Sequence, residues 1–105
     1  MKIIEKKYRG SIVFRILGYP IRYAIVKMLL EHGPLGLDDI VKHVGRAKNT
    51  VCEHLGKLKL ANIVRYEKER GRTIYFIKYP KELTILFDAC EKLVKRTTKG
   101  LETDY

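Results

Sequence analysis

The hydrophobic residues in the first third of the chain recur with the period of an α-helix. The run SIVFRIL at 11–17 is compact and apolar and is followed by Gly18, which predicts a short helix. Pro20 suits the first turn of a second helix, because its missing N–H would have no partner there. Apolar residues then recur at i, i+3, i+4, i+7 and i+8 from position 21, and Gly33-Pro34 ends the pattern.

The next part of the chain predicts two short helices joined by a tight turn. Residues 37–44 form the first, with two aspartates in its opening turn, where the helix dipole favours negative charge. After residues 45–47, a second helical pattern begins and places three apolar residues on one stripe: Val51, Leu55 and Leu58. Two helices so closely joined are typical of a helix-turn-helix, whose second helix reads duplex DNA.

The pattern becomes strand-like after residue 60. Residues 63–68 and 73–79 favour strands, the second being rich in Tyr, Ile and Phe, and the link at 69–72 contains a glycine. We therefore expect a β-hairpin. Pro80 opens a last helix. This order of elements predicts a mainly α fold with a β-hairpin wing, a winged helix-turn-helix.

A chain of 105 residues is long enough for one small domain. We expect a single winged-helix domain over residues 1–105, with a basic N-terminal segment at 1–10, a dimerisation helix at 81–97 and a tail at 98–105. The two cysteines form neither a paired metal motif nor a disulfide framework, which favours the reducing cytoplasm. No signal peptide is visible, and no apolar run approaches the roughly 18 residues of a spanning helix, so we expect no membrane partner.

The charge of the chain points to a polyanionic partner. Lys and Arg number 22 against 12 acidic residues, a formal net charge of +10, which favours nucleic acid ahead of a membrane. Nine basic residues and three acidic ones fall between Lys42 and Arg72, around the predicted reading helix and wing. The alternative is the lysine-rich surface typical of thermophilic proteins, which the absence of Gln also fits.

Four short motifs resemble the ArsR-type family of small prokaryotic repressors. Residues 17–22, LGYPIR, are similar to the family's Leu-x-x-Pro-x-Arg, and residues 50–58, TVCEHLGKL, to its reading helix Thr-Val-Ser-x-His-Leu-x-x-Leu. Residues 62–64, NIV, stand where Gly-Leu-Val is usual, and residues 71–76, GRTIYF, resemble the wing motif Gly-Arg-x-Val-Tyr-Tyr. The resemblance covers about residues 12–94. It implies a repressor that binds a palindromic operator in double-stranded DNA as a homodimer.

The chain departs from the metal-sensing members of that family. Their thiolate motif, Cys-x-Cys-Asp-Leu, falls on residues 36–40, which contain no cysteine. The last helix has Asp88-Ala89-Cys90 but lacks the histidines of the zinc-sensing pattern. We therefore expect no metal site and no cofactor.

A candidate DNA-binding set lies on the reading helix and the wing. Asn can pair with adenine and Glu can accept from the cytosine amino group, while basic side chains suit phosphates; the alternative is an ordinary solvated helix face. His54 either packs at the edge of the core or reaches DNA, and Cys52 is either a redox switch or a small tolerated side chain. The set comprises Arg46, Lys48, Asn49, Thr50, Cys52, Glu53, His54, Lys57, Arg70 and Arg72.

We expect a homodimer, because the apolar stripe of the last helix is longer than so small a domain can cover. The expected interface residues are Ile12, Phe14, Leu83, Leu86, Phe87, Cys90, Leu93 and Val94. No arrangement of residues suggests catalysis, so we expect no enzyme. The alternatives to a sequence-specific regulator are a winged-helix protein-interaction module and an RNA-binding module.

Overall fold

The computed structural model describes residues 6–97, so the predicted tail at 98–105 and part of the basic segment at 1–10 lie outside the described residues. The elements are a short 3-10 helix η1 (Lys6–Tyr8), α1 (Gly10–Leu17), α2 (Pro20–His32), β1 (Leu35–Gly36), α3 (Leu37–Val44), α4 (Lys48–Leu60), β2 (Val64–Glu69), β3 (Arg72–Ile77) and α5 (Pro80–Arg96). This order is a winged helix-turn-helix, and it confirms the predicted fold class.

Prolines and glycines set the ends of the helices where the sequence predicted them. Pro20 and Pro80 open α2 and α5. Gly45 ends α3 with φ 71°, a left-handed conformation that glycine adopts without steric cost, and its N–H donates to the Val41 carbonyl. That turn leaves only residues 45–47 between α3 and α4.

The wing is a three-stranded antiparallel sheet in the order β1-β3-β2. β2 and β3 pair from Val64↔Ile77 to Glu69↔Arg72, and Arg70 and Gly71 between them have φ 52° and 78°. Two positive φ angles are what a two-residue type I′ hairpin turn requires. The sequence predicted only this hairpin. β1, which pairs with the other edge of β3, has two residues and therefore no period of its own.

A single core holds the helices against the sheet. The predicted stripe of α4 is fully buried, at 0%, 1% and 0% exposure for Val51, Leu55 and Leu58. The other core residues come from α1, α2, α3, the wing with the residue before it, and α5: Leu17, Ile25, Val26, Leu29, Ile40, Ile63, Val64, Ile77, Leu83 and Phe87.

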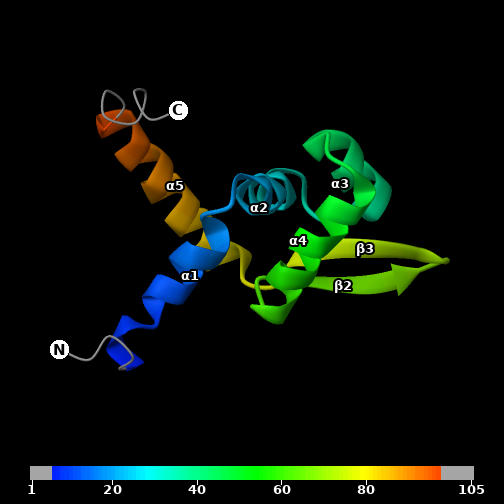
Figure 1. Cartoon of the computed structure of the whole chain (residues 1–105), viewed down its shortest axis with the longest axis horizontal. Helices are drawn as coiled ribbons and strands as arrows, with labels where there is room; N and C mark the ends of the chain where they lie inside the picture. The colour runs from blue at the N-terminus through cyan, green and yellow to red at the C-terminus, as the bar shows by residue number, and fades with distance from the viewer. Residues whose placement is uncertain (1–5, 98–105) are drawn as a thin grey trace.

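The two terminal helices lie at one end of the molecule. Figure 1 shows α1 and α5 diverging at the end opposite the tip of the β2–β3 hairpin, with α2 between them and α4. Both carry exposed apolar side chains, including Phe14 on α1 and Leu93 on α5 at 66% and 59% exposure. The molecule therefore presents an open apolar surface at one end and a basic wing at the other.

Candidate nucleic-acid interface

Helix α4 is anchored by its buried stripe and presents a polar face to solvent. Asn49, Cys52 and Glu53 are all exposed on this face. Gly56 is exposed as well, and a Cβ atom placed on it would meet no atom within 4 Å. Packing within the chain therefore does not require glycine at this position. A glycine in mid-helix costs about 1 kcal/mol relative to alanine, and no contact among the described residues accounts for it.

Basic side chains surround this face. Arg46 in the turn before α4, and Lys48 and Lys57 on the helix, are exposed. Thr50, which the sequence placed in the DNA-binding set, is half-buried in the first turn. At the far end of the helix, Nζ of Lys59 lies 4.6 Å from the centre of the Tyr66 ring on β2, a cation–π contact that ties α4 to the wing.

The two arginines that the sequence placed on the wing have different surroundings. Arg70 is exposed at the tip, in the turn itself. The guanidinium of Arg72 instead reaches β1, where its Nη2 lies 2.6 Å from the position that a Cβ atom on Gly36 would occupy. Arg72 is exposed and pairs with Glu69 beside the turn, while its side chain extends across the sheet towards β1, so its contact with DNA stays a prediction.

His54 lies at the edge of the core, which is the first of the two alternatives that the sequence left open. Its Nδ1 accepts a hydrogen bond of 3.0 Å from Nε of Arg22 on α2. Arg22 is only 8% exposed. Its Nη1 donates to the Ile16 carbonyl at 3.3 Å, and its guanidinium carbon lies 3.9 Å from the centre of the Tyr19 ring.

The sequence analysis missed Arg22 as a structural residue. A signal was present, because Arg22 precedes the buried Ile25 and Val26 by three and four positions and so shares their inward face. A cation on the inner face of an amphipathic helix needs a buried partner. Only the tertiary structure identifies that partner as His54, 32 positions away.

The predicted dimer surface divides into a buried part and an exposed part. Leu83 and Phe87 are 8% and 4% exposed within the single chain, so they belong to its core, and their place in an interface with a second chain stays a prediction. Leu86 and Cys90 are half-buried. The exposed apolar residues of α1 and α5 are Ile12, Val13, Phe14, Ile85, Leu93 and Val94, of which Val13 and Ile85 were not predicted.

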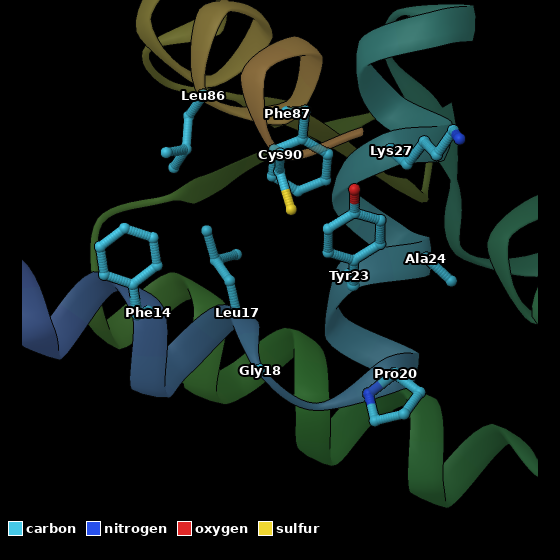
Figure 2. Close-up of a pocket in the computed structure, with 10 residues that line it drawn as sticks. All are labelled: Phe14, Leu17, Gly18, Pro20, Tyr23, Ala24, Lys27, Leu86, Phe87 and Cys90. Carbon is cyan, nitrogen blue, oxygen red and sulfur yellow. The ribbon is translucent and has the colours of Figure 1, made fainter. Parts of the chain in front are cut away.

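A groove of about 500 Å³ lies between α1, α2 and α5. In Figure 2, Phe14 and Leu17 line it from α1, Leu86 from α5, and the Tyr23 hydroxyl and Cys90 sulfur point towards each other. The Tyr23 ring stacks on Phe87 at 4.4 Å between ring centres. Burial, followed by the neighbouring Cys90, raises the pKa of Tyr23 to about 12. The groove is thus almost wholly apolar and its phenol stays neutral.

Within residues 6–97, no three His, Cys, Asp or Glu side chains lie close enough together to hold a metal ion. In the same part of the chain, no helix combines the length and the hydropathy needed to cross a membrane.

Comparison with known proteins gives matches to one class of regulators. Residues 19–66 match the sequence model of a family described as "Bacterial regulatory protein, arsR family". The chain is 32% identical over 74 residues to the uncharacterized HTH-type transcriptional regulator MJ1325 of Methanocaldococcus jannaschii, covering 70% of this chain and 83% of that protein. It is 30% identical over 88 residues to the transcriptional repressor SdpR of Bacillus subtilis, covering 84% and 92%. Among solved structures, Mycobacterium tuberculosis Rv0081 shares the fold, with a TM-score of 0.78 at 23% identity over 92% of this chain and 98% of that one.

Proposed function

This chain belongs to the ArsR family of DNA-binding transcriptional regulators, and we propose that it is a repressor that binds a palindromic operator in double-stranded DNA as a homodimer. Membership of this family makes the chain a regulator and not an enzyme. One observation carries the proposal: α4 buries a single apolar stripe and exposes a polar face with an unobstructed glycine at its centre. The similarity to SdpR, a transcriptional repressor, supports the choice of repressor.

The exposed face of α4 supplies the base contacts. Asn49, Cys52 and Glu53 are exposed side by side on this face, and Gly56 lets the backbone approach the edges of the bases. Asn is suited to adenine, and Glu to the amino group of cytosine. The proposed operator therefore carries at least one adenine and one cytosine in each half-site.

The phosphate contacts come from the basic residues around that face. We assign this role to Arg46, Lys48, Lys57 and, at the wing, Arg70, with Thr50 as a hydroxyl donor in the first turn of α4. His54 is assigned to the contact between α4 and α2, because its Nδ1 accepts a hydrogen bond from Arg22. Arg72 is assigned to the packing of β1 rather than to the tip of the wing.

The second subunit is proposed to cover the apolar ends of α1 and α5. Phe14, Leu93 and Val94 are exposed on these helices, beside a groove whose lining is almost wholly apolar. Exposed apolar side chains that continue from an apolar groove are typical of a surface that a partner covers. Pairing the same surface of two chains gives a closed two-fold dimer, which matches a palindromic site with two reading helices.

Selection of bound duplexes from a random pool, followed by sedimentation of the protein with the selected duplex, tests this proposal. We expect a palindrome whose half-sites are about one helical turn, roughly 34–36 Å, apart, bound by two chains. Equal affinity for the selected and a scrambled duplex at physiological salt would contradict it. Tighter binding to single-stranded RNA or to A-form helices would favour the RNA-binding alternative.

A further inference from the structure

A buried arginine connects α1, α2 and the reading helix. Arg22 on α2 donates one hydrogen bond to the carbonyl of Ile16, in the last turns of α1, and another to His54, in the middle of α4. Its guanidinium also lies on the ring of Tyr19, in the link between α1 and α2. Within residues 6–97, no carboxylate forms an ion pair or hydrogen bond with Arg22 or His54. The arginine charge is therefore held by a carbonyl, an aromatic face and an imidazole nitrogen.

The hydrogen bond between Arg22 and His54 determines the protonation state of the imidazole. A guanidinium can only donate, so Nδ1 of His54 must carry a lone pair, and the ring must be the neutral tautomer with its proton on Nε2. A protonated imidazole donates from both nitrogens and cannot accept this bond. It would also place a second positive charge 3.0 Å from the first. Among residues 6–97, the titratable or charged groups in contact with His54 are Arg22 from α2 and, at 5.9 Å between ring centres, Tyr19 in the link before α2.

We propose that Arg22 and His54 are positioning residues, which hold the reading helix at a fixed angle to α1 only while His54 is neutral, so that acidification lowers the sequence specificity of DNA binding. This inference rests on the proposed function, since α4 is taken as the helix that reads bases and α1 as part of the dimer surface. The two reading helices of a dimer must match two half-sites at once. A tilt of α4 relative to α1 is therefore repeated in both subunits.

Acid has two opposite effects on DNA binding, so a loss of positioning by His54 can be distinguished from a simple gain of positive charge. Histidine is the side chain whose charge changes between pH 5 and 8, and added positive charge strengthens binding to phosphates whatever the sequence. Loss of the bond to Arg22 instead weakens only binding that depends on the orientation of α4. The informative quantity is therefore the ratio of affinities for the selected and the scrambled duplex.

The test measures this ratio at pH 7.5 and pH 5.5, at constant ionic strength, for the full chain and three variants. In His54→Asn, the amide oxygen can replace Nδ1 as acceptor but cannot titrate; His54→Leu has no acceptor. His43→Asn is the matched control, because His43 is an exposed histidine on α3 whose ring, among the described residues, contacts the Asp39 carbonyl of its own helix and the His32 ring at the end of α2, and neither Arg22 nor α4.

We expect the ratio for the unmodified chain to fall between pH 7.5 and pH 5.5, by up to about ten-fold, the size expected for complete loss of one hydrogen bond to a charged group. The ratio should fall equally for His43→Asn. It should stay high at both pH values for His54→Asn and be low at both for His54→Leu. A fall in His54→Asn as large as in the unmodified chain would overturn the inference. So would loss of specificity by His54→Asn at pH 7.5.

A measurement without DNA separates this inference from the proposed function. The ¹⁵N chemical shifts of the His54 ring in the free protein should show an unprotonated Nδ1 at pH 7.5, and a proton on Nδ1 would overturn the inference even if the operator is found. If the unmodified chain selected no duplex, the proposed function would fail and the positioning role with it. If the unmodified chain selected a palindrome, and His54→Asn bound that palindrome with the same pH dependence as the unmodified chain, the inference alone would fail. The shifts remain measurable even if His54→Leu does not fold.

Discussion

Arg72 occupies the space in which Gly36 would carry a side chain: a Cβ atom on Gly36 would lie 2.6 Å from Nη2 of the guanidinium. Gly36 has an ordinary extended backbone, with φ −71°, so the glycine is needed for space and not for its conformation. It pairs with Ile74 on β3 and is also the residue before α3. The contact thus joins the first residue of β3 to the start of the helix-turn-helix.

We expect Gly36→Ala to displace the guanidinium of Arg72 while leaving the fold intact. The atom that a methyl group would meet is the far end of a flexible side chain, which can move, so the free energy of unfolding should fall by no more than about 1 kcal/mol. Urea denaturation measures this, and a crystal structure of the variant would locate Arg72. Gly56→Ala is the control, because a methyl group there meets nothing within 4 Å. Unfolding of Gly36→Ala would mean that the backbone of β1, and not Arg72, limits the space.

The period of the apolar residues and the positions of Pro and Gly were enough to predict all the helices from α1 to α5 and the hairpin. These features act locally, since a proline at a helix start or a glycine in a left-handed turn needs no distant partner. β1 could not be predicted, because its two residues show no alternation and pair with residues of β3 that lie 40 and 38 positions later, Leu35 with Tyr75 and Gly36 with Ile74.

The candidate site was predictable on its exposed side and less so on its inner side. The exposure of Asn49, Cys52 and Glu53 follows from the buried stripe of α4, which the sequence defines. The roles of His54 and Arg72 depend on which side chains meet across elements. His54 accepts a hydrogen bond from Arg22, and Arg72 lies against Gly36. No local sequence pattern predicts either contact.

We expect Asn49→Ala to relax the sequence preference of DNA binding. Asn49 is exposed on the reading face, and loss of a bidentate contact to adenine costs on the order of 1–3 kcal/mol at one base pair. Repeating the selection from random duplexes measures the change position by position. Arg70→Ala is the matched control: an exposed arginine at the wing tip should weaken binding to every sequence alike and reduce the salt dependence by about one phosphate contact. An unchanged motif with Asn49→Ala would show that α4 is oriented differently in the groove.

We expect Phe14→Glu to give folded monomers and Phe87→Glu to give unfolded protein. Phe14 is 66% exposed, so a charge there leaves the single chain stable but opposes its burial by a second chain. Phe87 is 4% exposed and stacks on Tyr23, so the same change should cost more than about 3 kcal/mol of folding free energy.

Sedimentation and circular dichroism distinguish these two outcomes. Lys92→Glu, which alters charge on an exposed position of α5, is the control and should remain dimeric. A Phe14→Glu variant that stays dimeric at micromolar concentration would place the dimer surface elsewhere. If the unmodified chain sediments as a monomer at that concentration, the homodimer itself is wrong.

We expect Tyr23→Phe to protect the fold against alkali. The pKa of Tyr23 is about 12 in the folded chain, while an unfolded tyrosine ionises near 10. Below pH 10 the phenol is neutral in both states and its burial costs nothing extra. As the pH rises from 10 to 12, the unfolded state loses the proton first, so the folded state is progressively destabilised. Phenylalanine keeps the ring that stacks on Phe87 and has no proton to lose.

The free energy of unfolding in urea, measured at pH 8, 10 and 11.5, should therefore fall less for Tyr23→Phe than for the unmodified chain. Tyr79→Phe, which changes an exposed phenol, should follow the unmodified chain. Parallel decline of all three proteins would show that the Tyr23 phenol ionises as readily in the folded chain as in the unfolded one.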